Sequence, residues 1–487
     1  MIAPTYSQPP NNPDALTLAQ APAPQVDLDR KREMHEAWKA YRGQFQKPLK
    51  VKKDQPDDNI LSNRCAPIVD KGVSFLFGQI VKIEVPDEQD QAYLAELFGD
   101  DDDMMTLFSK MSHNGGVCGH NFAKVIPATG NMQYPRVIPL DPQIIRTVTL
   151  PDDCEIPLAY IIEYPSWNEW QKRQIIARVD PNSDISTAGP EDLEDTWLIA
   201  NYVRKGSSGT WIQKGDVIEW DYPFPPIIDN QNLPNPNEFW GTPDLTPDLI
   251  GMNKAIIFVL SNLARILKFH GHPKTWIKGA NASQIQTGVD DILVLQSTEA
   301  EVGNLEMTSS LADFLSLLAD LRADMDEQSR VPAVALGRLA DLPKGNISGV
   351  ALQLLFQPLL EKTILKQRLY GAAIRQLVRV LLVLAGRLAA TQMAKYQVKL
   401  HWQNLLPVDD LAAAQTAQIL QAIGVSDDTL MQQLGYNADD EAEKSAKEDQ
   451  AKMTAFSRGQ GFPPQAQPGQ DAQQDQAAQQ KAEENKP

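Results

Sequence analysis

The spacing of hydrophobic and polar positions changes after about residue 240. Between about Ile80 and Trp240, short apolar runs such as VKIEVP, AYIIEY and TWLIANYV are separated by Pro, Asp and Gly. Several of these runs alternate as half-buried strands do, and a helix at about 89–111 interrupts them. Because strands do not alternate with long helices here, the pattern predicts an α+β fold whose sheet is mostly antiparallel.

After residue 240 the apolar positions recur at helical spacing. Two amphipathic helices are predicted at 244–270 and 311–330, joined by a short segment with the strand-like pieces TWIKG and ILVLQ. A third helix at about 348–389 would be unusually long, with a kink at Pro358. Two more helices are predicted ahead of the strands, from about residue 27 and at 60–77.

The two ends of the chain contain little that could form a core. Residues 1–27 hold six prolines and are expected to be a mobile arm, and residues 437–487 are rich in Gln, Ala and Pro and are expected to be a disordered tail. No basic segment followed by an apolar one precedes the first helix, so no signal peptide is expected. Charged residues such as Lys254 and Arg265 interrupt the apolar runs, so no membrane span is expected either.

Charge and motifs narrow the possible functions. The 487 residues include 45 Lys and Arg against 63 Asp and Glu, a formal net charge of −18. Such a chain repels phosphate backbones over most of its surface, which disfavours a sequence-reading DNA binder. No phosphate-binding loop, HExxH, CxxC or GxSxG motif occurs, so an ATP-driven motor is disfavoured and no catalytic residue or cofactor is predicted.

Two segments could be considered for metal binding. In HNGGVCGH, the side chains of His113, Cys118 and His120 could converge on a metal, but two glycines and a lone thiol also form an ordinary turn before a strand. The acidic run 100–103 could collect divalent cations, or it could be a solvated run at the start of a helix. We favour the structural alternative for both, and predict no metal site.

The order of these parts resembles the portal proteins of tailed bacteriophages, in the long-tailed branch. The resemblance covers roughly Ile60 to Gly386, and its most recognisable pieces are IVDKGVSFLFGQIVKI, GVCGHNFAKVIP with IPLDPQIIRTV, GTPDLTPDLIGMNKAI and VPAVALGRLADLPKGNISGVALQLLFQPLLEK. None of these pieces is a catalytic fingerprint. The resemblance implies a structural protein without chemistry of its own.

The resemblance also implies a division of the chain. The parts are an arm at 1–27, a wing at 28–240, a first stem helix at 241–270, a clip at 271–310, a second stem helix at 311–332, a tunnel loop at 333–348, a long helix with a return to the wing at 349–404, a helical crown at 405–436 and a tail at 437–487. Candidate tunnel-loop residues facing a DNA channel are Arg338, Asp341, Lys344, Gly345 and Asn346.

The stem helices are expected to pack between subunits, because neither helix alone has a buried partner on both sides. The candidate packing residues are Met252, Ile256, Leu263, Phe314, Leu318 and Leu321.

The function implied is a ring, usually of twelve identical subunits, at one capsid vertex of the virion after assembly in the host cytoplasm. Double-stranded DNA would pass through it without sequence specificity. The implied partners are the large terminase subunit, head-completion or adaptor proteins, and the major capsid and scaffolding proteins, with no membrane. An acidic ring fits this role because DNA that must move should not be held tightly. The alternatives are another ring-forming capsid-associated scaffold, or a metal-dependent hydrolase.

Overall fold

A computed structural model describes residues 17–51, 57–130, 132–150, 153–183, 193–194, 196–206, 209–271, 275–278, 301–304, 311–338 and 349–405, with the single positions 418, 420, 421, 426 and 430. The chain divides into two compact units, Met1–Leu405 and Leu406–Pro487. Nearly all described residues lie in the first unit, and the account below concerns that unit.

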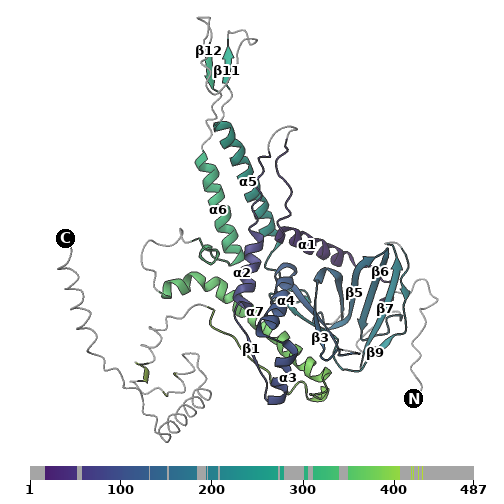
Figure 1. Cartoon of the computed structure of the whole chain (residues 1–487). Helices are drawn as coiled ribbons and strands as arrows, with labels where there is room; N and C mark the ends of the chain where they lie inside the picture. The colour runs from purple at the N-terminus through teal and green to yellow at the C-terminus, as the bar shows by residue number, and fades with distance from the viewer. Residues whose placement is uncertain are drawn as a thin grey trace, which may run out of the picture. The chain divides into compact units, whose positions relative to one another are not determined.

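The wing is built on a six-stranded antiparallel sheet with the order β4-β5-β6-β7-β8, in which β9 also pairs with β7 (Figure 1). Its strands are β4 (Ile145–Thr149), β5 (Pro157–Trp167), β6 (Trp170–Ala177), β7 (Trp197–Lys205), β8 (Ile212–Gln213) and β9 (Ile218–Trp220). Every strand pair within the described residues is antiparallel. The predicted α+β class is confirmed.

Two smaller sheets complete this part of the chain. One has the order β10-β2-β3, from β2 (His120–Ile126), β3 (Arg136–Leu140) and β10 (Ile227–Gln231). The other pairs β1 (Lys82–Glu84) with β13 (Lys399–His401), so the segment after the last long helix returns to the beginning of the wing.

Four helices stand ahead of and between these strands: α1 (Gln25–Tyr41), α2 (Cys65–Phe77), α3 (Glu88–Phe98) and α4 (Asp101–Cys118). The single helix predicted at 89–111 is wrong. Gly99 separates α3 from α4 with a φ of 70°, a backbone conformation that residues other than glycine rarely adopt. The acidic run then forms the start of α4, with Asp100 as its N-cap residue and Asp101, Asp102 and Asp103 in its first turn.

The segment HNGGVCGH does not form a turn before a strand. Helix α4 continues through both glycines to Cys118, and Gly119 ends it in the left-handed conformation, its amide donating to the carbonyl of Gly115 at 2.7 Å. Strand β2 begins at the next residue. The predicted buried cysteine is confirmed, since Cys118 is 5% exposed.

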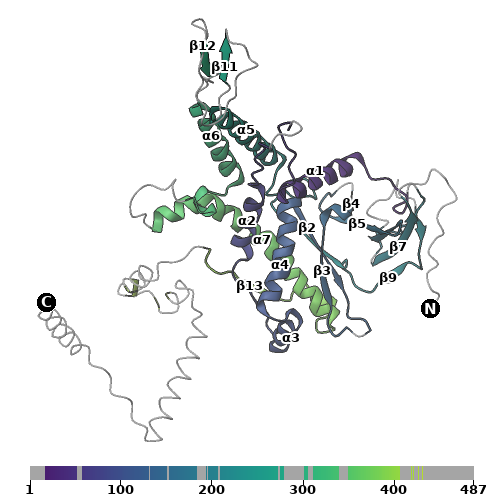
Figure 2. The ribbon, with the colours of Figure 1, turned by 45° about the horizontal axis from the view of Figure 1, so that its top comes forward.

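The stem consists of α5 (Pro247–Gly271) and α6 (Leu311–Ser329), which lie side by side (Figures 1 and 2). Between them, in the segment predicted as the clip, the described residues pair β11 (Thr275–Lys278) with β12 (Glu301–Asn304) in antiparallel order. Residues Pro247–Lys268 are long and apolar enough to cross a membrane by length and composition. The core helix of a water-soluble protein passes the same test, and α5 packs against α6, α2 and α1.

The longest helix, α7 (Gly349–Leu384), continues through Pro358. Both ribbon views show its first turns inclined to the rest of the helix, as the missing amide of an interior proline predicts (Figures 1 and 2). The helix ends at Leu384, five residues before the predicted boundary at 389. Gly386, two residues after this end, takes a positive φ of 70°. Its second half is the centre of one of the hydrophobic cores, with Leu377, Val378 and Leu381 fully buried.

Part of the expected mobile arm is packed against the wing. Leu18 is fully buried in the core beneath the six-stranded sheet. The buried guanidinium groups of Arg146 and Arg173 donate to the carbonyls of Pro22 and Ala19 at 2.8 and 2.7 Å. The expectation of disorder over 1–27 is therefore wrong for residues 17–27, because the side chains of Leu18 and Ala19 and these backbone carbonyls find partners on the sheet. Residues 1–16, most of the crown and the tail lie outside the described residues.

Candidate functional site: the stem and its base

The stem helices pair their apolar stripes with each other inside one subunit. Ile256 is fully buried and Leu318 is 5% exposed, and Met252, Phe314 and Leu321 are partly buried against the same core. These are residues that the sequence predicts as contacts between subunits. For Ile256 and Leu318 this prediction is corrected, because their surface is already covered within one chain.

Another set of apolar side chains on the stem and α7 remains uncovered. These residues are between 36% and 64% exposed: Phe258, Leu315, Leu317, Leu354, Leu355 and Ile364. Single exposed apolar residues are common, but a set on adjoining helices is typical of a surface that a partner covers.

A buried charged cluster ties the base of the stem to α7. The carboxylate of Asp244, just ahead of α5, has no exposed surface, and it pairs with the ammonium groups of Lys362, at 2.9 Å, and of Lys366. Both lysines come from α7 and are 3% and 1% exposed. Three charges without access to water are maintained only when each has a close partner.

Lys362 has a further partner at the C-terminal end of α6. The ammonium of Lys362 also donates to the backbone carbonyl of Ser329 at 3.0 Å, the last residue of α6. The carbonyl groups at a helix C-terminus carry partial negative charge, which compensates a nearby cation. The cluster therefore connects the start of α5, the end of α6 and the middle of α7.

Two glycines allow the neighbouring helices to approach this cluster. A Cβ at Gly116 on α4 would lie 3.0 Å from Oδ2 of Asp244, and a Cβ at Gly72 on α2 would lie 3.2 Å from the same oxygen. The next glycine, Gly115, faces the hydroxyl of Tyr370, which a Cβ would strike. Gly115 and Gly116, which suggested a turn in the sequence HNGGVCGH, therefore allow close helix packing around the cluster.

The cluster shifts the pKa values of its members. Burial by itself raises the pKa of Asp244, but Lys362 and Lys366 outweigh it and lower that pKa to about 2. Burial lowers the pKa of Lys366 to about 8, against the opposing attraction of Asp244. At neutral pH, Asp244 and Lys366 are both charged.

Sequence analysis missed this cluster. The available signal was Lys362 and Lys366, two cations four residues apart on a largely apolar helix, where residues at that spacing share a face. The partner Asp244 lies more than a hundred residues earlier, so the sequence alone does not show that they meet.

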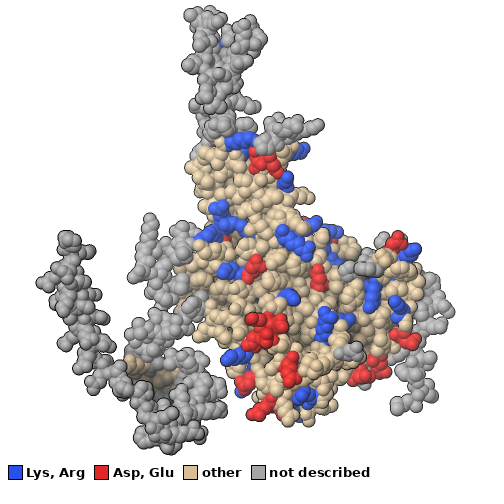
Figure 3. All heavy atoms as spheres, viewed as in Figure 1, with Lys and Arg blue, Asp and Glu red and all other residues tan. Residues whose placement is uncertain are grey.

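Several cations gather at the base of the stem, where Figure 3 shows positive side chains on the viewed face. Arg338, predicted to face DNA, forms an ion pair with Asp326 of α6. Burial and the neighbouring charges of Arg338 and Arg322 lower the pKa of Arg64, against the attraction of Asp326. The other tunnel-loop candidates, Asp341, Lys344, Gly345 and Asn346, lie outside the described residues.

The predicted metal candidates do not converge. Nδ1 of His113 lies 2.8 Å from the carbonyl of Ser109, and Nε2 of His120 lies 3.1 Å from the carboxylate of Asp229 on β10. Burial raises the pKa of the Cys118 thiol well above its ordinary value. Within the described residues no three His, Cys, Asp or Glu side chains are grouped so as to hold a metal ion.

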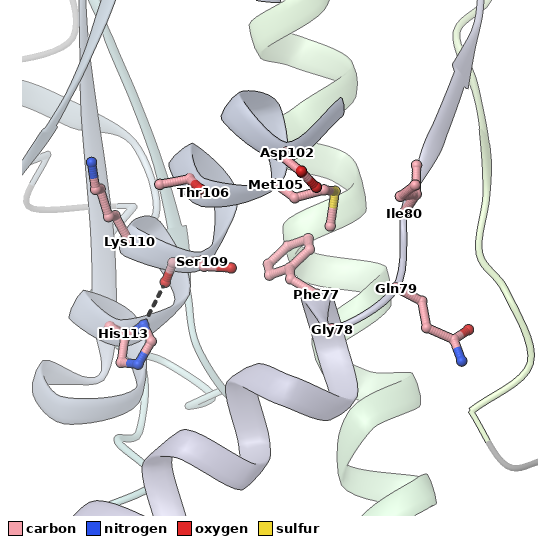
Figure 4. A pocket seen from close by; sticks show the side chains of 10 residues that line it. All are labelled: Phe77, Gly78, Gln79, Ile80, Asp102, Met105, Thr106, Ser109, Lys110 and His113. Atoms are coloured by element: carbon pink, nitrogen blue, oxygen red, sulfur yellow. Dashed lines mark hydrogen bonds between the residues drawn. The ribbon is translucent and has the colours of Figure 1, made fainter. Parts of the chain in front are cut away.

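His113 borders an open hollow of about 410 Å³ between the end of α2 and α4 (Figure 4). Its other lining residues include Phe77, Met105, Thr106 and Lys110. Figure 4 shows His113 bonded to Ser109 on its own helix, and Nε2 of the same ring lies 3.4 Å from the carboxylate of Asp70 on α2. Both ring nitrogens of His113 are therefore engaged, one by the carbonyl of Ser109 and one by Asp70.

Residues 252–455 match the model of the family described as phage portal protein, SPP1 Gp6-like. The resemblance to phage portal proteins is confirmed over these residues. The match takes in most of α5 and all of α6 and α7. No protein with a curated description matches the chain.

Solved structures similar to this chain come from gene transfer agent (GTA) particles. A chain in the neck of a native GTA particle computed with C12 symmetry shares 13% identity with a TM-score of 0.43, and one in the neck of an empty GTA particle computed with C6 symmetry shares 11% with a TM-score of 0.43. A chain in the virion of a native GTA particle shares 13% with a TM-score of 0.39. Each similarity covers 76% of this chain and 90% of the other.

Proposed function

We propose that this chain is the subunit of a phage portal ring, the conduit through which double-stranded DNA enters and leaves a capsid. The observation that carries the proposal is the family match over 252–455, which falls on the two stem helices and the long helix. The family is structural, and the proposed role requires no chemistry from this chain.

The surface of the stem supports assembly into a ring. Phe258, Leu317 and Leu354 leave about half or more of their surface exposed in the single chain. Removing apolar surface from water is favourable by about 25 cal/mol per Å², from which the entropy lost on association must be subtracted. A ring of identical copies would cover these side chains by head-to-tail contacts.

The charge of the chain supports passage of DNA without tight binding. Each subunit has a formal net charge of −18, so a ring of such subunits repels phosphate groups over most of its surface. The cations at the base of the stem are in part neutralised within the chain, as with Arg338 and Asp326. The proposed duplex would therefore meet few unpaired cations and slide with little retention.

The remaining parts of the proposal follow the family role. The ring would occupy one capsid vertex of the virion after assembly in the host cytoplasm, and usually contain twelve copies. The clip between the stem helices would dock the large terminase subunit during packaging and adaptor proteins afterwards. Capsid and scaffolding proteins would surround the wing.

Two alternatives remain distinguishable. A capsid-associated ring of another kind would share the exposed stem surface but would not be needed for DNA packaging. A metal-dependent hydrolase would use His113, Cys118 and His120, or the acids 100–103. The two histidines contact Ser109, Asp70 and Asp229, and the acids form the start of α4.

Electron microscopy of the purified chain and a packaging experiment test the proposal. We expect rings with an open centre, and capsids that form but remain empty of DNA when the gene is deleted. A chain that stays monomeric at high concentration would contradict ring assembly. Filled capsids in the deletion would contradict the portal role while leaving a different ring protein possible.

A further inference from the structure

The outward face of α6 carries a regular acidic stripe. Asp313, Asp320, Asp324 and Glu327 are exposed and lie along one side of the helix, with half-exposed Leu317 between them. Separations of three, four and seven residues place side chains on one helix face. Among the described residues, no ion pair involves any of these four acids.

The outward face of α5 carries a basic stripe at similar spacing. Lys254, Phe258, Arg265 and Lys268 follow one another by four, seven and three residues, and Phe258 is 50% exposed. Arg265 and Lys268 share the carboxylate of Asp58 at 3.4 and 3.0 Å, which leaves a surplus positive charge. Both stripes extend over roughly 21 Å, at about 1.5 Å per residue.

A single chain cannot join its own two stripes. Helix α5 turns Ile256 inward, and α6 turns Leu318 and Met325 inward, where all three are buried in one core. Because a helix advances about 100° per residue, the charged stripes point about half a turn away from these inward positions. The acidic side of one stem and the basic side of another are therefore free to meet.

We propose that α5 of one copy packs against α6 of the next copy in the ring, with the basic stripe facing the acidic stripe. This inference rests on the proposed ring and adds which faces form its contact. The antiparallel order of the two helices brings Lys268 near the partner's Asp313 at the clip end and Lys254 near the partner's Glu327 at the base. Opposed charges of this kind fix orientation and partner choice, while Phe258 and the exposed leucines supply apolar contact.

Charge reversal and its repair test the contact. The variant D313K/E327K places like charges opposite Lys268 and Lys254 of the basic stripe and is expected to lose the ring peak on a sizing column. The variant K254E/K268E is expected to do the same, while the Arg265–Asp58 pair remains in place. Combining all four substitutions in one chain restores opposite charges at every contact, and we expect rings of normal size to return.

A matched control separates this contact from a general charge effect. The variant D216K/D221K makes the same charge change at two exposed positions on the wing and is expected to assemble normally. Far-UV circular dichroism checks that every variant is folded. Rings of normal size from D313K/E327K would overturn the inference, and such rings binding DNA more tightly would place the acidic stripe on the channel instead. A four-fold variant that fails to assemble while folded would overturn it as well. A wild-type chain that never forms rings would refute the proposed function itself.

Discussion

Replacing Asp244 by asparagine is expected to destabilise the fold strongly, since it leaves the ammonium groups of Lys362 and Lys366 without their carboxylate. Asparagine keeps the shape of the side chain, so the variant tests charge instead of volume. Removal of one partner from a buried ion pair costs about 3–5 kcal/mol of unfolding free energy. Because the side chains concerned are almost fully buried, water cannot replace the lost partner.

The loss of unfolding free energy in the Asp244→Asn variant has an upper limit, because one of the two lysines can lose its proton and become neutral. Neutralising an ordinary lysine at pH 7 takes roughly 4.6 kcal/mol, from about 3.4 pH units at about 1.36 kcal/mol each. If the variant uses this route, its unfolded state binds a proton that its folded state lacks. Its stability then rises by about 1.4 kcal/mol per pH unit between about pH 6 and pH 8.

The wild-type chain has a different pH dependence. The pKa of Lys366 is lowered to about 8 in the folded state, so this lysine keeps its proton in both states at lower pH. Its contribution makes stability rise only between about pH 8 and the ordinary lysine pKa of 10.5, where the unfolded state alone retains the proton. The pKa of Asp244, lowered to about 2, adds stability that is lost as pH falls from about 4 toward 2.

The assay is denaturant unfolding followed by tryptophan fluorescence, at several pH values between about 6 and 8. The double variant D244N/K366M removes one of the two uncompensated charges, while Lys362 keeps the carbonyl of Ser329. We expect the double variant to be more stable than D244N alone, with K366M alone as the packing control. A D244N chain within about 1 kcal/mol of wild type, or a double variant less stable than D244N, would refute the reasoning.

Five further substitutions test the packing described above, each followed by thermal or denaturant unfolding. Gly116→Ala is expected to cost about 1–3 kcal/mol by overpacking, whereas Gly251→Ala, where a Cβ meets nothing within 4 Å, is expected to be neutral or stabilising. Leu18→Ala is expected to cost about 2–5 kcal/mol, and no loss would show that residue 18 is not part of the wing core. Leu318→Asp is expected to destabilise the subunit itself, while Leu354→Asp is expected to leave the subunit stable and to weaken only the ring; equal unfolding midpoints would contradict this distinction.

The sequence predicted the helices of the stem closely and the details around glycines poorly. The amphipathic period located α6 to within one residue, since a long periodic segment leaves little choice of structure. The break at Gly99 and the helical run through Gly115 were missed. A glycine permits a left-handed turn and also permits close helix contact, and the sequence does not say which of these its neighbours require.

The sequence by itself determined the α+β class, the long helices, the negative charge and the resemblance to phage portal proteins, because composition and period are local properties of the chain. Only the tertiary structure decided which partner each apolar stripe faces, and it placed Ile256 and Leu318 inside the subunit. It alone brought Asp244 to Lys362 and Lys366, across more than a hundred residues. Burial and charge pairing depend on contacts between distant segments, and a periodic pattern records only that a face is apolar, not what covers it.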